Sequence, residues 1–302
     1  MNKFLDKILL RTNNLDYISL AIKDLSLKTP VNKIFNAINN HSDTSEIRYV
    51  GGCLRKIIRR EKVDDIDLAT NLNPKEVISA LKKNDINFYE TGIEHGTITV
   101  IIEDHKFEIT SLREDINTDG RHAKVKFSID WKKDASRRDF SINSIYSDAN
   151  GNLFDPFNGK KDLENGLIKF IGNPEKRIKE DYLRILRYVR FFLNYSKVDH
   201  KNSLKKIIKQ NINGISKISS DRLLDELKKL VLSKGFLKLS KDIFSQEIIT
   251  LVFPQLIHLN IFRNINDFSN KIINQKDFIF LISLMIIDDT DNSEYFIYKY
   301  NI

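Results

Sequence analysis

Two carboxylates set two residues apart, Asp65 and Asp67, constrain this chain more than any other feature. The apolar run Ile47–Val50 comes before a Gly-Gly pair, a basic stretch that predicts a helix follows, and then comes the sequence Asp-Ile-Asp. Successive side chains of a strand point to opposite faces, so we expect both carboxylates on one face and Ile66 in the core. Two carboxylates side by side are costly without a cation, and Mg²⁺ prefers carboxylate oxygens. The stretch predicts a metal site.

The glycines and basic residues between the apolar run and the acidic pair suggest what the metal would serve. A strand, the turn Gly51-Gly52 and a helix start offer free N–H groups and a positive dipole end to phosphates. Arg55 and Lys56 add positive charge one turn into that helix. Each part alone has a simpler explanation, a solvated pair of carboxylates or an ordinary turn. Together and in this order they predict a metal-dependent nucleotide site.

The same stretch, YVGGCLRK…DDIDLAT, resembles the opening motif of the class II tRNA nucleotidyltransferase and poly(A) polymerase family. Family members carry G-G-x-V-R-D, a short turn, and D-x-D-L/I-A-T. The two glycines, Arg55 and both aspartates match. Lys56 stands where the family has Asp, and Arg59-Arg60 replace a usual turn glycine. The resemblance implies that Asp65 and Asp67 are catalytic and hold Mg²⁺.

Composition limits the classes of protein to which the chain can belong. With 302 residues, 41% of them hydrophobic and 30% charged, it can bury a substantial core. The formal charge of +8 suggests a polyanionic partner. One cysteine excludes an internal disulfide framework and fits a reducing compartment. The N-terminus has no uninterrupted apolar core of a secretory signal, and no apolar run approaches a membrane span. We therefore expect a cytoplasmic or organellar-matrix protein.

Periodicity predicts the elements around the acidic pair. Residues 1–46 have helical spacing of apolar positions, and Asn73-Pro74 predicts a capped helix through about Lys83. Thr97–Ile102 and Lys106–Leu112 alternate about the turn Glu103-Asp104-His105, which predicts a β-hairpin. Glu108 lies on its polar face and is a candidate third carboxylate of the site; a hydrogen-bonded surface glutamate is the alternative. Strands and helices interleave up to residue 146, which predicts an α/β or α+β head.

A second informative block runs from Arg113 to Tyr146. Asn117–Gly120 breaks regular structure and predicts a loop. Arg137 and Arg138 suit a triphosphate, and Asp139 can accept a hydrogen bond from a ribose hydroxyl; we expect them at the entrance of a strand or helix. The block resembles the flexible-loop and R-R-D-F-T-I-N motifs of bacterial and mitochondrial CCA-adding enzymes, with Arg113 as a supporting residue. Relatives that add only CC tend to lack this loop, so its presence favours full CCA addition.

The third block, EDYLRILRYVRF, begins at Glu180. We predict that Asp181 and Arg184 share a helix face, which Arg187 and Arg190 extend. An intrahelical salt bridge is the simple interpretation. The functional one is that a carboxylate and a guanidinium complement the Watson–Crick edge of C or A and reject U and G. The block resembles the family's E-D-x-x-R motif, which implies nucleotide recognition, with Glu180 in support.

The resemblance covers roughly Arg48 to Leu230, including the connector-like LFDPFNGKKDL at Leu153–Leu163. It implies an α+β fold: a polymerase-β-type nucleotidyltransferase head (1–165), an all-α neck that recognises the base and binds RNA (166–235), and a helical body (236–302). From Pro174 the pattern is helical to the end. The implied reaction adds C, C and A to the 3′ end of tRNA from CTP and ATP, with Mg²⁺. A poly(A) polymerase and a catalytically silent RNA-binding relative are the alternatives.

Overall fold

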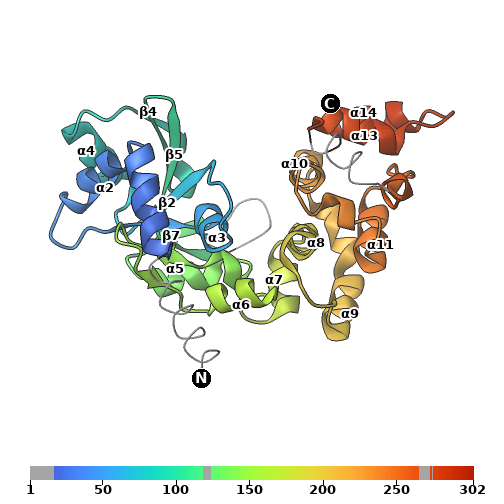
Figure 1. Cartoon of the computed structure of the whole chain (residues 1–302), viewed down its shortest axis with the longest axis horizontal. Helices are drawn as coiled ribbons and strands as arrows, with labels where there is room; N and C mark the ends of the chain where they lie inside the picture. The colour runs from blue at the N-terminus through green and yellow to red at the C-terminus, as the bar shows by residue number, and fades with distance from the viewer. Residues whose placement is uncertain (1–16, 118–123, 265–272, 274) are drawn as a thin grey trace, which may run out of the picture. The chain divides into compact units, whose positions relative to one another are not determined.

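The computed structural model of the chain describes residues 17–117, 124–264, 273 and 275–302 (Figure 1). The chain divides into two compact units, which separate between Glu164 and Asn165. The predicted loop lies mostly outside the described residues, as do the apolar positions expected for the first helix at 4–9.

The first unit is built on a seven-stranded mixed sheet with the strand order β3-β4-β5-β2-β1-β8-β9, and β6 pairs with β7 in a separate ribbon. The β2–β5 pair is parallel and every other pair in the two sheets is antiparallel. The strands are β1 (Ile47–Val50), β2 (Ile66–Thr70), β3 (Phe88–Gly92), β4 (Thr97–Ile102), β5 (His105–Ser111), β6 (Arg113–Asn117), β7 (Lys124–Phe127), β8 (Tyr146–Ser147) and β9 (Leu153–Phe154).

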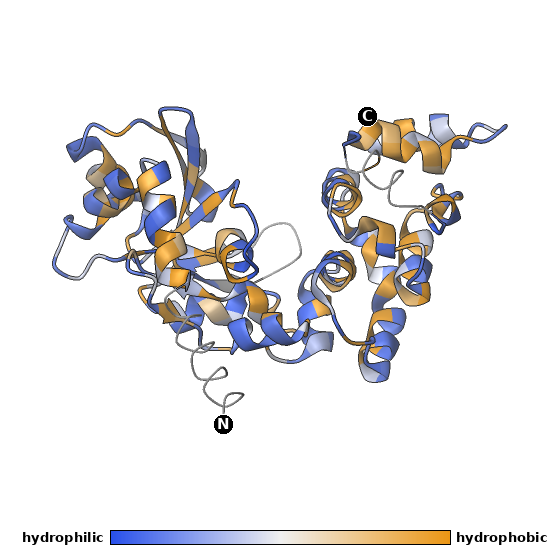
Figure 2. Ribbon diagram, in the orientation of Figure 1, coloured by the Kyte–Doolittle hydropathy of each residue, from blue (hydrophilic) through white to orange (hydrophobic). Residues whose placement is uncertain are grey.

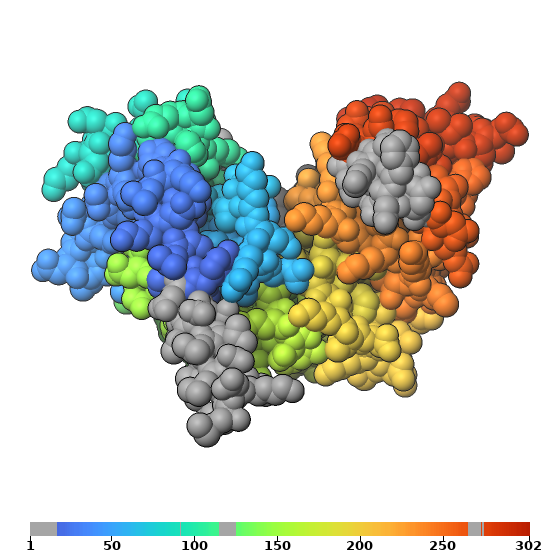
Figure 3. Space-filling view, in the orientation of Figure 1, coloured from blue at the N-terminus to red at the C-terminus, as the bar shows by residue number. Residues whose placement is uncertain are grey.

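Helices cover the apolar face of this sheet. Residues 17–28 are helical, followed by α2 (Val31–Asn39) and α4 (Pro74–Lys83). Their buried side chains form one core with the inward residues of β2, β4 and β5, such as Ile66 and Phe107. Figure 3 shows residues 17–45, in blue, spread over this side of the unit. The remaining helices of the unit are α3 (Gly52–Ile58), α5 (Trp131–Arg137) and α6 (Gly159–Asn165), with short 3₁₀ turns at η1 (Ile93–His95) and η2 (Ser141–Asn143).

Several local predictions are confirmed. Asn73 caps α4 in a capping box with Glu76, and the helix ends at Lys83. The hairpin forms as expected except that Ile102 pairs with His105, so His105 begins β5 and the turn holds only two residues. Glu103 in that turn has φ 56°. Left-handed backbone allows a tight two-residue connection, which the sequence pattern alone did not show.

Arg60 is one of the two arginines, Arg59-Arg60, that replace a usual turn glycine of the family that the chain resembles. Its φ is 57°, in the left-handed region that glycine enters without cost. The Arg60 guanidinium lies 4.5 Å from the centre of the Tyr17 ring. This cation–π contact offsets part of the backbone strain.

The second unit contains only helices among its described residues. They are α7 (Pro174–Glu180), α8 (Arg184–Tyr195), α9 (Asn202–Asn211), η3 (Ile212–Lys217), α10 (Ser220–Val231), η4 (Phe236–Lys238), α11 (Ile243–Val252), η5 (Leu259–Phe262), α13 (Phe278–Ile286) and α14 (Asn292–Tyr300). The predicted class, an α+β head followed by an all-α region, is confirmed. Figure 2 shows that α13 is apolar over most of its length. Across the described ranges, no helix is long and apolar enough to cross a bilayer.

Candidate active site

The acidic centre of the first unit is built on neighbouring parallel strands. Asp67 of β2 lies directly opposite Glu108 of β5 in the ladder, and Glu108 lies opposite Thr99 of β4. Ile66 and Phe107, one residue earlier on each strand, are buried in the core. Register alone therefore places Asp67 and Glu108 side by side on the polar face of the sheet.

Asp65 precedes the first residue of β2 and is exposed, while Asp67 is half-buried. Burial raises the pKa of Asp67, and the nearby carboxylates of Glu108 and Asp65 raise it further; Arg55 and Arg138 act in the opposite direction. The three acidic side chains therefore form a region of negative potential that a cation would relieve.

The Gly51-Gly52 turn lies against the Asp67 carboxylate. Gly51 has φ 70°, and a Cβ added at Gly51 or Gly52 would lie 3.8 or 3.7 Å from Asp67 Oδ2. Both distances are ordinary van der Waals contacts, so it is the positive φ of Gly51 that favours glycine here. The Arg55 guanidinium donates to Asn143 Oδ1 of η2, which holds it toward this turn. The predicted arrangement of strand, turn and helix start is confirmed as structure.

The carboxylate pair fits a hard divalent cation by the chemistry of its donors, since Asp65 and Asp67 supply only oxygen ligands. No set of three His, Cys, Asp or Glu residues with the geometry of a closed metal site occurs in the part of the chain that the structure describes. Glu108 is hydrogen-bonded to Lys106, with 2.7 Å between Oε1 and Nζ. That contact matches the alternative given above for Glu108, a hydrogen-bonded glutamate.

Arg137 and Arg138 end α5, and Asp139 directly precedes Phe140, the N-cap of η2, so the segment leads out of one helix and into another. Both arginines donate to the buried carboxylate of Asp134, which also accepts a 2.6 Å hydrogen bond from Tyr146 Oη. Asp139 is buried and accepts from the Asn143 amide at 2.6 Å. The segment is thus a largely buried polar network, and Asn143 links it to Arg55 beside the Gly51-Gly52 turn.

Arg113, predicted as a supporting residue, begins β6. Its backbone N–H donates to Asp134 Oδ1 at 3.3 Å, and its guanidinium donates to the carbonyl of His95. Arg113 therefore ties the β6–β7 ribbon to the rest of the first unit.

The prediction that Asp181 and Arg184 share a helix face is wrong. α7 ends at Glu180, Asp181 has φ −155°, and α8 begins at Arg184. Asp181 Oδ1 accepts from the Leu183 N–H, and such local bonds compete with helix continuation. Asp181 forms an ion pair with Arg222 of α10 at 2.8 Å, and Arg184 forms one with Glu180 at 2.6 Å.

Arg187 and Arg190, which we expected to extend the helix face of Asp181 and Arg184, lie on α8. Arg190 donates to the buried Glu226 of α10 at 2.5 Å, and its guanidinium lies 4.3 Å from the centre of the Phe191 ring. The Arg187 guanidinium lies 5.8 Å from the same ring. Arg190 therefore serves at least to join α8 to α10.

Three residues that organise the predicted site residues were not singled out from the sequence: Asp134, Arg222 and Glu226. Helical spacing could have found Asp134, which is three and four residues before the two arginines. Arg222 and Glu226 are four apart on α10 and could have been recognised as a charged face. Their partners lie 41 and 36 residues away in the chain, a distance that spacing rules do not reach.

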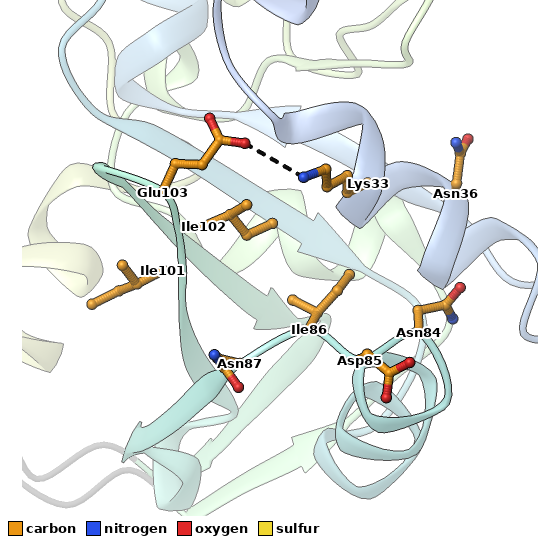
Figure 4. Close-up of a pocket in the computed structure, with 9 residues that line it drawn as sticks. All are labelled: Lys33, Asn36, Asn84, Asp85, Ile86, Asn87, Ile101, Ile102 and Glu103. Carbon is orange, nitrogen blue, oxygen red and sulfur yellow. Dashed lines mark hydrogen bonds and ion pairs between the residues drawn. The ribbon is translucent and has the colours of Figure 1, made fainter.

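A separate hollow of the first unit lies between α2, the α4–β3 connection and the end of β4 (Figure 4). Its volume is about 530 Å³, and Lys33 and Glu103 form an ion pair across it at 3.4 Å. None of the predicted site residues lines it.

The chain matches known protein families in sequence. Residues 47–169 match the family model described as the poly A polymerase head domain. Residues 201–259 match a second model, described as a probable RNA and SrmB-binding site of polymerase A. The first match contains the acidic centre and the Asp134 network, and the second covers α9 to α11.

Relatives of known name match the same part of the chain. The human mitochondrial CCA tRNA nucleotidyltransferase 1 is 43% identical over 195 residues, which are 63% of this chain and 44% of the relative. The CCA-adding enzyme of Lactobacillus johnsonii is 36% identical over 192 residues, 63% of this chain and 47% of the relative. The match therefore spans less than half the length of these relatives.

Solved structures share the fold. A CCA-adding enzyme in its apo form II superposes with a TM-score of 0.68 at 22% identity, covering 89% of this chain and 67% of that one. A tRNA nucleotidyltransferase complexed with a primer tRNA and an ATP analogue gives 0.65 at 23% identity, covering 85% and 77%. Residues 47–169, which hold the acidic centre, and residues 201–259 thus match two poly(A) polymerase family models, and the fold is that of solved CCA-adding enzymes.

Proposed function

We propose that this chain adds C, C and A to the 3′ end of tRNA, using CTP and ATP and releasing pyrophosphate. The observation that carries the proposal is the acidic centre on β2, with Asp67 against Gly51-Gly52. The relatives named as CCA-adding enzymes, and solved structures of such enzymes with CTP, with ATP and with tRNA, support the substrates.

In this proposal each group near the centre has one task. The carboxylates of Asp65 and Asp67 would hold Mg²⁺. The N–H groups of the Gly51-Gly52 turn and the Arg55 guanidinium would bind the triphosphate. Arg137 and Arg138 would add positive electrostatic potential at the triphosphate while they remain paired with Asp134.

The reaction forms a bond between the RNA 3′ oxygen and the α-phosphorus and breaks the bond from that phosphorus to the pyrophosphate oxygen. When bound, Mg²⁺ supplies charge stabilisation to the attacking and leaving oxygens. The chain's own residues position and neutralise: the carboxylates fix the cation on the sheet, and the turn and Arg55 hold the triphosphate so that its leaving group faces away from the RNA end. The hydroxyl proton passes to solvent.

Base selection is proposed for Asp181 and Arg184. A carboxylate acceptor and a guanidinium donor complement the edge shared by C and A. Arg222 and Glu180 would hold these two side chains in place through the ion pairs described above. We also propose that Asp139, Arg187 and Arg190 belong to the nucleotide site.

For the location of the protein, we propose a reducing compartment such as the cytoplasm or an organellar matrix.

Two alternatives have distinct products. A poly(A) polymerase is favoured by the description of the matching head-domain model, and it would extend an RNA with many A residues from ATP alone. A silent RNA-binding relative would incorporate nothing. The deciding experiment incubates the protein with tRNA that ends before CCA and supplies CTP and ATP separately and together. CCA addition predicts two residues from CTP alone and three from both.

Substitution of the acidic pair tests the site itself. We expect Asp65→Asn and Asp67→Asn each to reduce incorporation by at least about a thousandfold, since the oxygen ligands of the cation are lost, while tRNA binding changes little. Asp104→Asn, an exposed aspartate in the β4–β5 turn of the same unit, is the control and should retain most activity. Near-normal turnover in either Asp65→Asn or Asp67→Asn would remove the pair from the mechanism.

A further inference from the structure

The two proposed metal ligands are held in different ways. Asp67 lies inside β2 and is fixed by the ladder to β5. Asp65 lies in a segment, residues 61–65, that has no regular secondary structure and precedes the first paired residue of the strand. Its position must therefore be set by contacts other than strand pairing.

One contact is made by Val63, which packs against the core, and the polar ones come from the end of α3. The Glu61 N–H donates to the carbonyl of Lys56 at 2.8 Å, and the Arg59 guanidinium donates to the Glu61 carboxylate at 3.0 Å. The Lys56 ammonium forms an ion pair with Asp64, the residue next to Asp65. Lys56 thus holds both ends of the five-residue segment, one through its carbonyl and the other through its side chain.

The Lys56 side chain is well placed for this task. The side chain of Lys56 is 27% exposed and that of Asp64 is 64% exposed, so the lysine side chain is the more confined of the two. The family motif that the chain resembles has Asp at this position, so the contact is a feature of this chain. A lysine in a cation-binding motif would oppose the metal if it acted by charge alone.

We propose that Lys56 is a positioning residue: through its ion pair with Asp64 it fixes Asp65 for metal binding. The inference rests on the proposed function of the Asp65 and Asp67 pair. A charge effect and a positioning role predict opposite changes in the affinity for the cation when Lys56 is removed. By charge alone, removing Lys56 would tighten the binding of a cation; as a positioning residue, removing it weakens that binding.

The test is binding of Mn²⁺ to the full chain without RNA, followed by the loss of the free-ion signal in electron paramagnetic resonance. We expect Lys56→Met to weaken binding about threefold to tenfold, between the effect of an exposed ion pair and that of a hydrogen-bonded partner of a metal ligand. Lys62→Met removes the same charge from the segment itself and is the matched control; it should bind Mn²⁺ as well as the unchanged chain or slightly better.

The exchanged pair Lys56→Asp with Asp64→Lys keeps the net charge and the ion pair, and it should restore most of the lost affinity. In CTP incorporation, Lys56→Met should raise the Mg²⁺ concentration needed for half-maximal rate and leave kcat nearly unchanged. A thermal melt checks that each variant is folded.

The outcomes separate the two proposals. If the unchanged chain binds Mn²⁺ and Asp65→Asn abolishes that binding, the metal site stands. Equal or tighter binding by Lys56→Met then overturns the role of Lys56, as does failure of the exchanged pair to restore affinity. If Asp65→Asn binds Mn²⁺ like the unchanged chain, the proposed metal role of Asp65 is overturned, and the role of Lys56 with it.

Discussion

Asp134 shows how much a single residue supports this site. Its side chain is 1% exposed and accepts hydrogen bonds from Arg137, Arg138 and Tyr146. Burial alone would raise the pKa of Asp134, but the two guanidinium groups and the tyrosine hydroxyl lower it well below its ordinary value. The carboxylate is therefore charged at every pH at which the protein works.

Replacing Asp134 should cost stability in a pH-dependent way. Asp134→Asn removes a buried negative charge that pairs with two largely buried guanidinium groups, which costs about 3–5 kcal/mol. Because the pKa of Asp134 is lower in the folded state, its contribution is complete above about pH 5 and declines as pH falls below the unfolded value near 3.9. Urea unfolding between pH 3 and pH 7 measures both effects.

Asp130→Asn is the matched control for this prediction, since Asp130 caps the same helix and asparagine caps equally well. It should unfold within about 0.5 kcal/mol of the unchanged protein. If Asp134→Asn loses no more than this control, the network does not stabilise the fold.

Local chemistry made most of the acidic centre predictable. Asp65, Asp67, the Gly-Gly turn and the position of Glu108 follow from strand alternation and from residues close in sequence. Asp134 and its partners are also close in sequence, but nothing in their spacing shows that they are buried. The bond between Asp181 and Arg222 was beyond prediction because it depends on how two helices pack.

At the scale of elements, the break between α7 and α8 changes how the proposed base-reading residues are arranged. A continuous helix would place Asp181 and Arg184 one turn apart. A pattern of apolar positions cannot distinguish one helix from two that are separated by three residues, as here. In the structure Asp181 is free of helical geometry and depends on α10 for its orientation. Base selection would then rely on three helices.

Arg222→Met should therefore affect nucleotide use without unfolding the protein. The pair with Asp181 is about a quarter to a third exposed, so we expect its loss to cost no more than about 1 kcal/mol, or about fivefold. The KM for CTP and ATP should rise by about this factor, and UTP misincorporation should increase relative to CTP. Competition with all four nucleotides measures this.

Lys228→Met removes an exposed charge from the same helix and serves as the control for this substitution. Unchanged base preference in Arg222→Met would mean that the ion pair only ties α10 to the α7–α8 junction.

For the molecule as a whole, the chain divides into an α+β unit and an all-α unit, and both classes follow from periodicity. The resemblance contributed what periodicity cannot, namely which face of the sheet carries chemistry. The formal charge of +8 is a property of the whole chain, because no single run of lysines stands out in the sequence as a binding site. Such a charge predicts an electrostatic contribution to RNA binding.

Affinity for tRNA should consequently fall steeply with salt. With about four phosphate contacts, counterion release predicts a loss of roughly a hundredfold between 50 and 200 mM monovalent salt. Filter binding at several salt concentrations gives the slope. Asp65→Asn should show the same slope, since that carboxylate is proposed to hold metal and not RNA; a salt-independent affinity would argue against a charged RNA-binding face.

The parallel pairing of β2 with β5 also has a consequence for the order in which the chain folds. Asp67 and Glu108 are neighbours in the ladder although 41 residues separate them in the chain, and α4, β3 and β4 lie between. Closing so long a connection costs chain entropy, which the intervening helix and hairpin reduce by forming first from local contacts. We therefore expect the acidic centre to form late in folding, after the apolar face of the sheet that supports it. The carboxylates, which repel one another, then come together only once that apolar face is buried.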